Sequence, residues 1–214
     1  MSDNNLILDN NLKDRVNVFN NNIYNKKQPN NGQHDVVLIQ LPLWGAFHPP
    51  LAHGLLKSWL QHNGITCKTI DANAHVYTTR GKKYFDFWHM KHSQSDKLFI
   101  RQTMVEMYKD FRPLMLYYMN EIARSKPLVI GCSVFDSSRI FSEIFLEDFR
   151  RHYPGCKHVL GGPGVAHFMK NTDDLISLDH IDAVCQDEGE NALLDYVNEV
   201  KSNTGKPVAG MVYK

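Results

Sequence analysis

The sequence predicts an α/β protein built on a doubly wound, flavodoxin-like parallel sheet with strand order 2-1-3-4-5. Short apolar runs rich in β-branched residues recur along the chain, which is typical of strands buried on both faces. Segments with apolar residues at helical spacing separate these runs. Strand–helix–strand alternation implies parallel pairing through right-handed crossovers. In a sheet of this order the switch point lies between strands 1 and 3.

The first strand is the most clearly marked, because residues 36–41 read Val-Val-Leu-Ile-Gln-Leu without a break. Four more runs follow it, and a sixth run lies at the end of the chain. The expected strands are residues 36–41, 66–70, 128–134, 158–160, 181–185 and 208–213.

Three helices are expected between these strands, at residues 51–62, 140–152 and 191–200. The first ends at Asn63-Gly64, which is a favourable C-cap. The second stops before Pro154-Gly155. Each carries apolar residues along one face, as a helix that packs on a sheet requires.

The chain divides into an Asn-rich segment over residues 1–32, expected to be a flexible leader, and one α/β domain over residues 33–214. Residues 74–126 form a helical insertion between strands 2 and 3, in which Pro113 is expected to kink or split a helix. This insertion either covers a face of the sheet or docks another domain. Its apolar stripe is Ile100, Met104, Met107, Phe111, Met115, Tyr118 and Ile122.

Composition limits the classes of function. The 214 residues carry a formal net charge of +1, which gives no basic surface field for nucleic acid. The four cysteines stand far apart, against a zinc or iron–sulfur site made by this chain alone. No apolar run is long enough to span a bilayer and no signal segment is evident. We therefore expect a cytoplasmic protein whose partner is a small molecule or another protein.

Candidate site residues follow the strands, because ligands of doubly wound sheets bind outside the carboxyl ends of the strands. The loop after strand 1 is apolar and aromatic and suits a large, flat ligand, although Trp44 and Phe47 can equally pack inward. After strand 3, Asp136 or Ser137 is a plausible N-cap of the next helix. The alternative is that Ser133 and the backbone after it hydrogen-bond a ligand tail that enters the end of the sheet.

The loops after strands 4 and 5 are also candidates. Three glycines and a proline, Gly161-Gly162-Pro163-Gly164, would let a ligand touch the backbone directly. In Gln186-Asp187-Glu188-Gly189-Glu190, Asp187 and Glu190 either form a capping box or contact a ligand.

Several chemistries lack their motifs. The loop after strand 1 has neither a glycine-rich dinucleotide fingerprint nor a P-loop. Among the eleven histidines, His48 and His53 are five residues apart and His89 and His92 three apart, without Asp, Glu or Cys at matching spacing, so no metal site is expected. No catalytic residue is evident. A small nucleotide- or sugar-binding enzyme of the same fold would need a base or nucleophile at a strand end.

Taken in order, these segments resemble the cobalamin-binding domain at the N-terminus of class B radical-SAM enzymes. After the strand at Val36–Pro42, the family pattern P-P-L-G-L-x-x-L-A, N-G, D, G-I-S, L-G-G-P and G-E-G-E is similar to Pro49–Leu56, Asn63-Gly64, Ile70–Asn73, Gly131–Ser133, Leu160–Pro163 and Gln186–Glu190. Ala52-His53 departs from the usual Gly-Leu, and Asp187 stands where the first glycine usually does. The resemblance covers residues 35–214.

The resemblance implies a cobalamin at the carboxyl edge of the sheet, with its nucleotide tail between strands. The implied cofactor-binding residues are Leu43, Trp44, Gly45, Phe47, His48, Ser133, Phe135, Ser137, Gly161, Gly162, Pro163, Gly164, Gln186, Glu188 and Gly189.

The Asp-x-His-x-x-Gly motif that supplies a lower axial histidine in corrinoid methyltransferases is absent, because Leu43-Trp44-Gly45-Ala46 occupies its place. We therefore expect cobalamin binding without a protein histidine ligand. Trp44 or Phe47 would lie against the lower face of the corrin, with His48 as a lesser alternative ligand.

The cysteine triplet of the radical-SAM barrel is also absent, so no iron–sulfur cluster is expected on this chain. The implied function is a cobalamin-binding module that supports methyl transfer. A radical-SAM domain or protein would dock on the insertion or the C-terminus. The alternative is a degenerate adaptor that binds no cofactor and recruits a partner protein.

Overall fold

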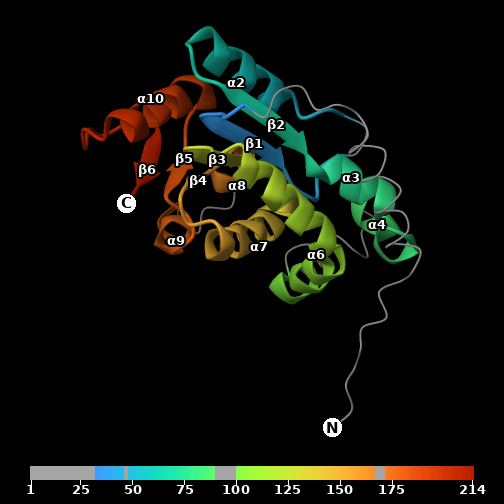
Figure 1. Cartoon of the computed structure of the whole chain (residues 1–214). Helices are drawn as coiled ribbons and strands as arrows, with labels where there is room; N and C mark the ends of the chain where they lie inside the picture. Colours follow the sequence, from blue (N-terminus) through green and yellow to red (C-terminus); the bar gives the residue numbers. More distant parts are fainter. Residues whose placement is uncertain (1–31, 46–47, 90–99, 167–171) are drawn as a thin grey trace.

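A computed structural model describes residues 32–45, 48–89, 100–166 and 172–214. Its six strands form one sheet in the order β2-β1-β3-β4-β5-β6 (Figure 1). The first five strands are parallel, and β6 is antiparallel to β5. The predicted order 2-1-3-4-5 is confirmed, and β6 extends it at the β5 edge. The strands are β1 Val36–Gln40, β2 Cys67–Asp71, β3 Val129–Ser133, β4 Lys157–Gly161, β5 Ala183–Cys185 and β6 Met211–Tyr213.

The central strands are buried on both faces, as their continuous apolar sequences require. All five residues of β1 are buried, and β3 is buried as far as Cys132. Gly131 allows close packing within the sheet, because a Cβ at this position would lie 2.8 Å from Cδ2 of Leu38 on the neighbouring strand. This pairing places the carboxyl ends of β1 and β3 side by side.

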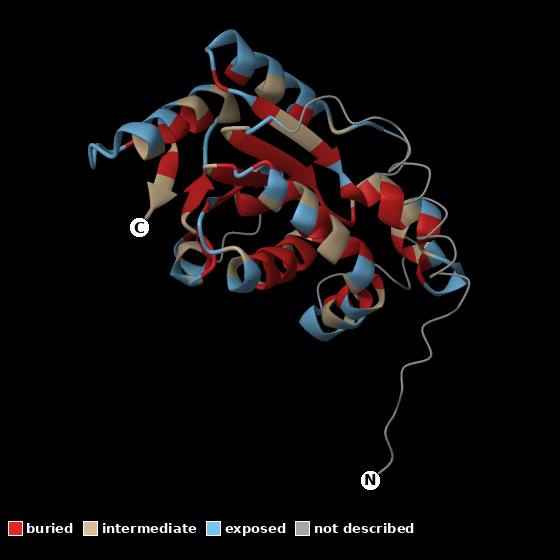
Figure 2. Cartoon of the chain, in the orientation of Figure 1, coloured by how far each residue is buried: buried red, intermediate tan, exposed pale blue. Residues whose placement is uncertain are grey.

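Helices cover both faces of the sheet (Figure 1). One face carries α2 (Leu51–His62) and α10 (Gly189–Ser202), which enclose a core with residues such as Leu60, Tyr196 and Val197. The other face carries α6 (Arg101–Arg124) and α7 (Asp136–His152). The buried side of each of these helices turns toward the sheet, and the exposed side toward solvent (Figure 2).

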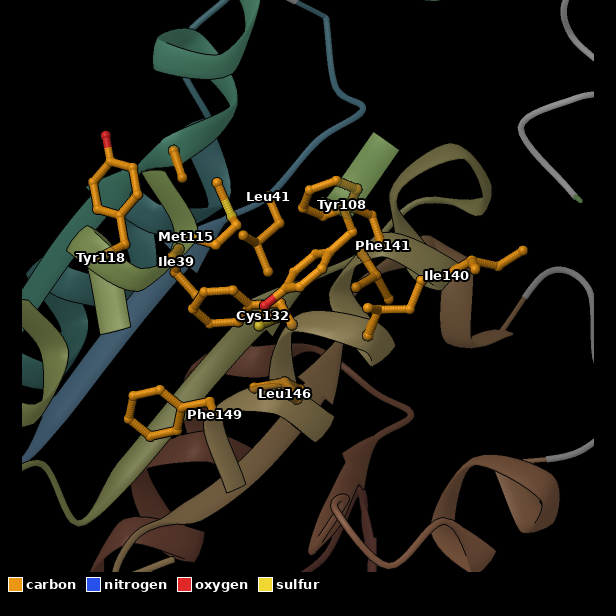
Figure 3. Close-up of a cluster of buried hydrophobic side chains, with 14 of the residues drawn as sticks. Ile39, Leu41, Tyr108, Met115, Tyr118, Cys132, Ile140, Phe141, Leu146 and Phe149 are labelled. Carbon is orange, nitrogen blue, oxygen red and sulfur yellow. The ribbon is translucent and has the colours of Figure 1, made fainter. Parts of the chain in front are cut away.

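The insertion covers the sheet with its apolar stripe. It comprises α3 (Ala72–Thr79), a 3-10 turn (Lys82–Tyr84), α4 (Phe85–Trp88) and α6. Six residues of the predicted stripe are buried, whereas Ile100 is exposed. Met115 and Tyr118 of α6 lie with Phe141 and Phe149 of α7 against Ile39 of β1 (Figure 3). The stripe therefore belongs to the core and is not free to dock a partner.

Pro113 lies inside α6, which continues through it as one helix from Arg101 to Arg124. A split at Pro113 is therefore wrong, whereas a kink there stays a prediction. Pro113 is on the exposed side of the helix, where the carbonyl left without a helical partner can be hydrated. Buried residues on either side, Phe111 and Leu114, hold both halves against the core.

Residues 1–31, which include almost all of the predicted leader, lie outside the described residues. Within the part of the chain that the structure describes, no helix has the length and apolar character needed to cross a membrane. The four cysteines are free and buried. Burial raises the pKa of the thiols of Cys67, to about 12, and of Cys156, to about 11.

The remaining short helices are α8 (Pro163–Ala166) and α9 (Thr172–Ser177), which lie between β4 and β5. Both precede β5 on the side of the sheet that carries α7, since Val165 and Leu175 belong to the same core as Phe145. The loop that leads into α8 contributes to the candidate site described next.

Candidate functional site

The switch point lies at the carboxyl ends of β1 and β3. From β1 the chain turns through α2 to β2, and from β3 it turns through α7 to β4 on the opposite face. The loops after the two strands therefore lead to opposite faces of the sheet, and the edge between them is the usual ligand site in open α/β sheets. Residues 42–45 and 134–135 form the described parts of these loops.

Two aromatic rings meet at this switch point. The rings of Trp44, after β1, and Phe135, after β3, are stacked with centroids 3.9 Å apart and an interplanar angle of 23°. Both residues are half-buried, so part of their surface remains open to solvent. We call Trp44 and Phe135 the aromatic pair. It provides an apolar surface at the position where a ligand of this fold would bind.

Side chains at the starts of α3 and α7 fix the backbone beneath the aromatic pair. The N–H of Trp44 donates to Oδ1 of Asn73 over 3.1 Å, and Nδ2 of Asn73 donates to the Trp44 carbonyl over 3.2 Å. The Ser137 hydroxyl donates to the Leu43 carbonyl over 2.7 Å. An irregular loop whose polar backbone groups are bound in this way is ordered before any ligand arrives.

The other predicted residues of this loop differ in their surroundings. The side chain of Leu43 is 2% exposed and belongs to the core. Leu43 contributes to the candidate site through its backbone carbonyl, which accepts the Ser137 hydroxyl. Gly45 is exposed, and a Cβ built on it would meet nothing within 4 Å. His48 is exposed. Phe47 lies outside the described residues.

The start of α7 corrects the predicted N-cap. The helix begins at Asp136 with Phe135 as its N-cap, so neither Asp136 nor Ser137 occupies that position. Instead, Oγ of Ser138 accepts the Phe135 N–H over 3.0 Å. Ser137 is left to hold Leu43, while Oδ1 of Asp136 is buried without a hydrogen-bond partner in the protein.

The glycines after β4 hold two loops against each other. Gly162 has φ +94°, and a Cβ there would lie 2.9 Å from both the Ser133 hydroxyl and the Val134 carbonyl oxygen. A Cβ on Gly164 would lie 2.6 Å from the Phe135 carbonyl carbon. The loop after β4 therefore packs directly on the loop after β3. Pro163 begins α8 and is exposed, and Gly161 contacts Cys185 on β5.

The loop after β5 lies at the same edge of the sheet but makes its contacts elsewhere. Gln186 is exposed, and its Nε2 donates to the Thr172 hydroxyl over 2.7 Å. Glu188 is the exposed N-cap of α10, with no side-chain cap hydrogen bond. Gly189 faces Leu56 of α2, which a Cβ would approach to 3.1 Å.

The predicted capping box of Asp187 and Glu190 is wrong, because α10 begins two residues after Asp187. Asp187 instead lies against Gly210, the positive-φ residue of the turn before β6. This turn brings β6 back beside β5 and occupies the space that a cap would use. Glu190 is in the first turn of α10, where its charge favours the positive helix end.

Metal ligation by the protein finds no support among the described residues, which contain no group of three His, Cys, Asp or Glu side chains able to hold a metal ion. His53 on α2 is buried, and neither ring nitrogen has a hydrogen-bond partner in the protein. Burial lowers the pKa of His53 to about 4, so the ring is neutral at pH 7. The candidate site thus offers an apolar surface and hydrogen-bonding groups, which suits binding.

Comparison with known proteins supports the fold. Neither protein-family models nor curated proteins match the chain. Two solved structures of the radical S-adenosylmethionine methyltransferase TsrM from Kitasatospora setae are similar to it, both at 15% identity. The structure with tryptophan substrate and aza-SAM bound has a TM-score of 0.55 and covers 84% of this chain. The structure with cobalamin and a [4Fe-4S] cluster bound has a TM-score of 0.53 and covers 85%. The chain spans 28–29% of the TsrM chains.

Proposed function

We propose that this chain is a cobalamin-binding module of a radical-SAM-type system and supports methyl transfer performed with a radical-SAM domain. The observation that carries the proposal is the aromatic pair, a partly exposed apolar surface at the switch point of a doubly wound sheet. The fold that the chain shares with TsrM, of which one structure contains cobalamin, supports the same reading.

The residues at the switch point fit the group. A corrin ring is broad, flat and largely apolar on its faces, and Trp44 and Phe135 offer it a stacked aromatic surface. Nε1 of Trp44 and Oδ1 of Asp136 are a buried donor and acceptor without partners in the protein. The peripheral amides of a corrinoid can supply both kinds of partner.

The residues of this chain would have different roles in binding the cofactor. The partly exposed aromatic pair would contact the corrin, and no histidine would ligate the cobalt. Ser133, beside Gly162, would hydrogen-bond the tail. Gly162 and Gly164 would shape the rim by letting two loops pack together. When bound, cobalamin supplies a cobalt centre that accepts and releases a methyl group.

Reconstitution tests the proposal. The purified chain is incubated with hydroxocobalamin and passed through a desalting column, and the absorption spectrum of the eluted protein is recorded. We expect a coloured protein with about one cofactor per chain. W44A should weaken binding by about tenfold or more, because a buried aromatic contact contributes about 1–3 kcal/mol.

Trp59→Ala is the matched control, since Trp59 is 38% exposed and lies near the C-terminal end of α2, whereas the loop of the aromatic pair precedes the start of that helix. It should retain the colour of the wild type. A colourless eluate from the wild-type chain would refute the proposal, and equal loss in W44A and W59A would refute the role of the aromatic pair.

An adaptor without cofactor is the second candidate, and one observation favours it. Leu51, Leu55 and Trp59 recur every fourth residue along α2 and are exposed by 74%, 52% and 38%. Such an apolar stripe is a common feature of protein interfaces. A colourless wild type that gains a partner through this stripe would support the adaptor. The cytoplasmic location stays a prediction.

A further inference from the structure

Asn73 makes three side-chain hydrogen bonds at the base of the candidate site. It lies near the start of α3, directly after β2, and is 1% exposed. Its Oδ1 accepts the backbone N–H of Trp44 and, over 3.0 Å, the indole N–H of Trp88 on α4. Its Nδ2 donates to the carbonyl of Trp44. One amide thus binds both polar backbone groups of the residue that forms half of the aromatic pair.

Only a primary amide of this length meets these demands. The site needs an acceptor for two N–H groups and a donor for one carbonyl from the same short side chain. A carboxylate would keep the acceptor but turn a repulsive lone pair toward the Trp44 carbonyl. Alanine would leave two buried backbone groups without partners. Trp88 fixes the orientation of the Asn73 amide in turn. Its indole N–H can only donate a hydrogen bond, so the amide atom that faces it must be the oxygen.

We propose that Asn73 is a positioning residue for the cofactor: it holds Trp44 in the orientation in which its ring stacks on Phe135, and α4 of the insertion locks it through Trp88. The expected effect of Asn73 on the affinity for cobalamin rests on the proposed function. The position of Trp44 itself is a property of the cofactor-free protein. The two statements can therefore be tested separately.

The first measurement follows Trp44 without cofactor. The chain contains three tryptophans, Trp44, Trp59 and Trp88. Labelling with 5-fluorotryptophan gives three fluorine NMR signals, which the single variants W44F, W59F and W88F assign. N73A should shift the signals of Trp44 and Trp88 and leave that of Trp59 unchanged. An unmoved Trp44 signal in N73A would overturn the inference, whatever the chain binds.

The second measurement is a titration with hydroxocobalamin. N73A should bind about tenfold more weakly, because the loop must then be ordered on binding. W88F removes one of the three hydrogen bonds and should lose less. N120A is the matched control, since Asn120 is exposed on α6 and accepts a hydrogen bond from Tyr153. It should bind as the wild type does.

N73D distinguishes positioning from general stability. Burial and the Trp44 carbonyl oxygen would raise the pKa of its carboxyl group, against the two N–H groups donated to the other oxygen, which would lower it; we expect burial to dominate. Once protonated it carries both a donor and an acceptor, as the amide does. Affinity relative to wild type should therefore recover as the pH falls from 8 to 5.5, with the Trp44 signal returning to its wild-type position. If N73A shifts Trp44 while the wild type fails to bind cobalamin, the proposed function falls and the positioning of Trp44 stands. Wild-type affinity in N73A would overturn the role of Asn73.

Discussion

Replacing Gly164 by alanine tests whether the glycines after β4 serve the fold or a ligand. Gly164 faces backbone atoms, because a Cβ there would lie 2.6 Å from C and 2.8 Å from Cα of Phe135. Ordinary contact begins at 3.4 Å, so the two loops would have to separate by roughly 0.8 Å. No side-chain rotation can relieve such a clash.

The separation would strain two hydrogen bonds that join these loops. The N–H of Gly164 donates to Val134 O over 2.8 Å, and the N–H of Val134 donates to Gly161 O over 2.7 Å. Overpacking costs about 1–3 kcal/mol, and weakening the hydrogen bonds about 1 kcal/mol more. We expect G164A to lower the free energy of unfolding of the cofactor-free protein by about 2–4 kcal/mol.

Urea denaturation followed by far-ultraviolet circular dichroism measures the loss. Gly54→Ala is the control, because Gly54 is exposed in α2 and a Cβ there meets nothing within 4 Å. It should raise the stability by about 0.5–1 kcal/mol. If G164A unfolds at the wild-type urea concentration and only cobalamin binding suffers, the glycines act on a ligand and the reasoning from packing is wrong.

Two further predictions concern buried polar groups. Burial lowers the pKa of His53, His75 and His158 to about 4 in the folded protein, against 6.5 when exposed. Above pH 6.5 these histidines are neutral in the folded and the unfolded state, and the stability of the protein is at its full value. As the pH falls toward 4, the unfolded state is protonated first and the free energy of unfolding decreases, by about 1–2 kcal/mol per histidine at pH 5. The urea midpoints of unfolding at pH 7 and pH 5 measure this change in stability. H53L should reduce the difference between the two midpoints, and equal midpoints in the wild type would contradict the prediction. Asp148 accepts the Tyr108 hydroxyl over 2.8 Å and pairs with Arg112. D148A should lower the free energy of unfolding by about 2–4 kcal/mol, whereas D174A, at an exposed carboxylate, should leave it unchanged. Thermal unfolding measures both variants, and a small loss in D148A would show that water replaces the carboxylate.

The elements with strong apolar patterns were predictable from the sequence. Residues 51–62 were predicted as a helix and coincide with α2, because the stripe and the Asn63-Gly64 stop mark both ends. The start of α7 was missed by four residues, since its first turn is polar and is supported by the Ser138 hydroxyl, which accepts the Phe135 N–H. The antiparallel direction of β6 depends on the turn at Gly210, a tertiary feature without a distinct local signal.

The candidate site was predictable in outline only. Strand order placed Trp44 and Phe135 at the switch point, but their stacking depends on how two loops far apart in sequence meet. Asn73 was missed as a site residue, although an Asn two residues after a strand is a signal worth weighing. The contact of Gly164 with Phe135 could not be read from the sequence, because glycine near a ligand and glycine near another loop look the same.

The direction of β6 sets the route between this domain and anything that follows it. Because β6 runs against β5, Lys214 ends beside Asp182, which directly precedes β5, so the last residue leaves at the amino edge of the sheet. The aromatic pair lies at the opposite edge. A continuing polypeptide must travel back along the height of a five-residue strand, about 16 Å, before it can approach the pair. Any segment tethered at this end therefore needs a connector of at least about five extended residues to reach the aromatic pair.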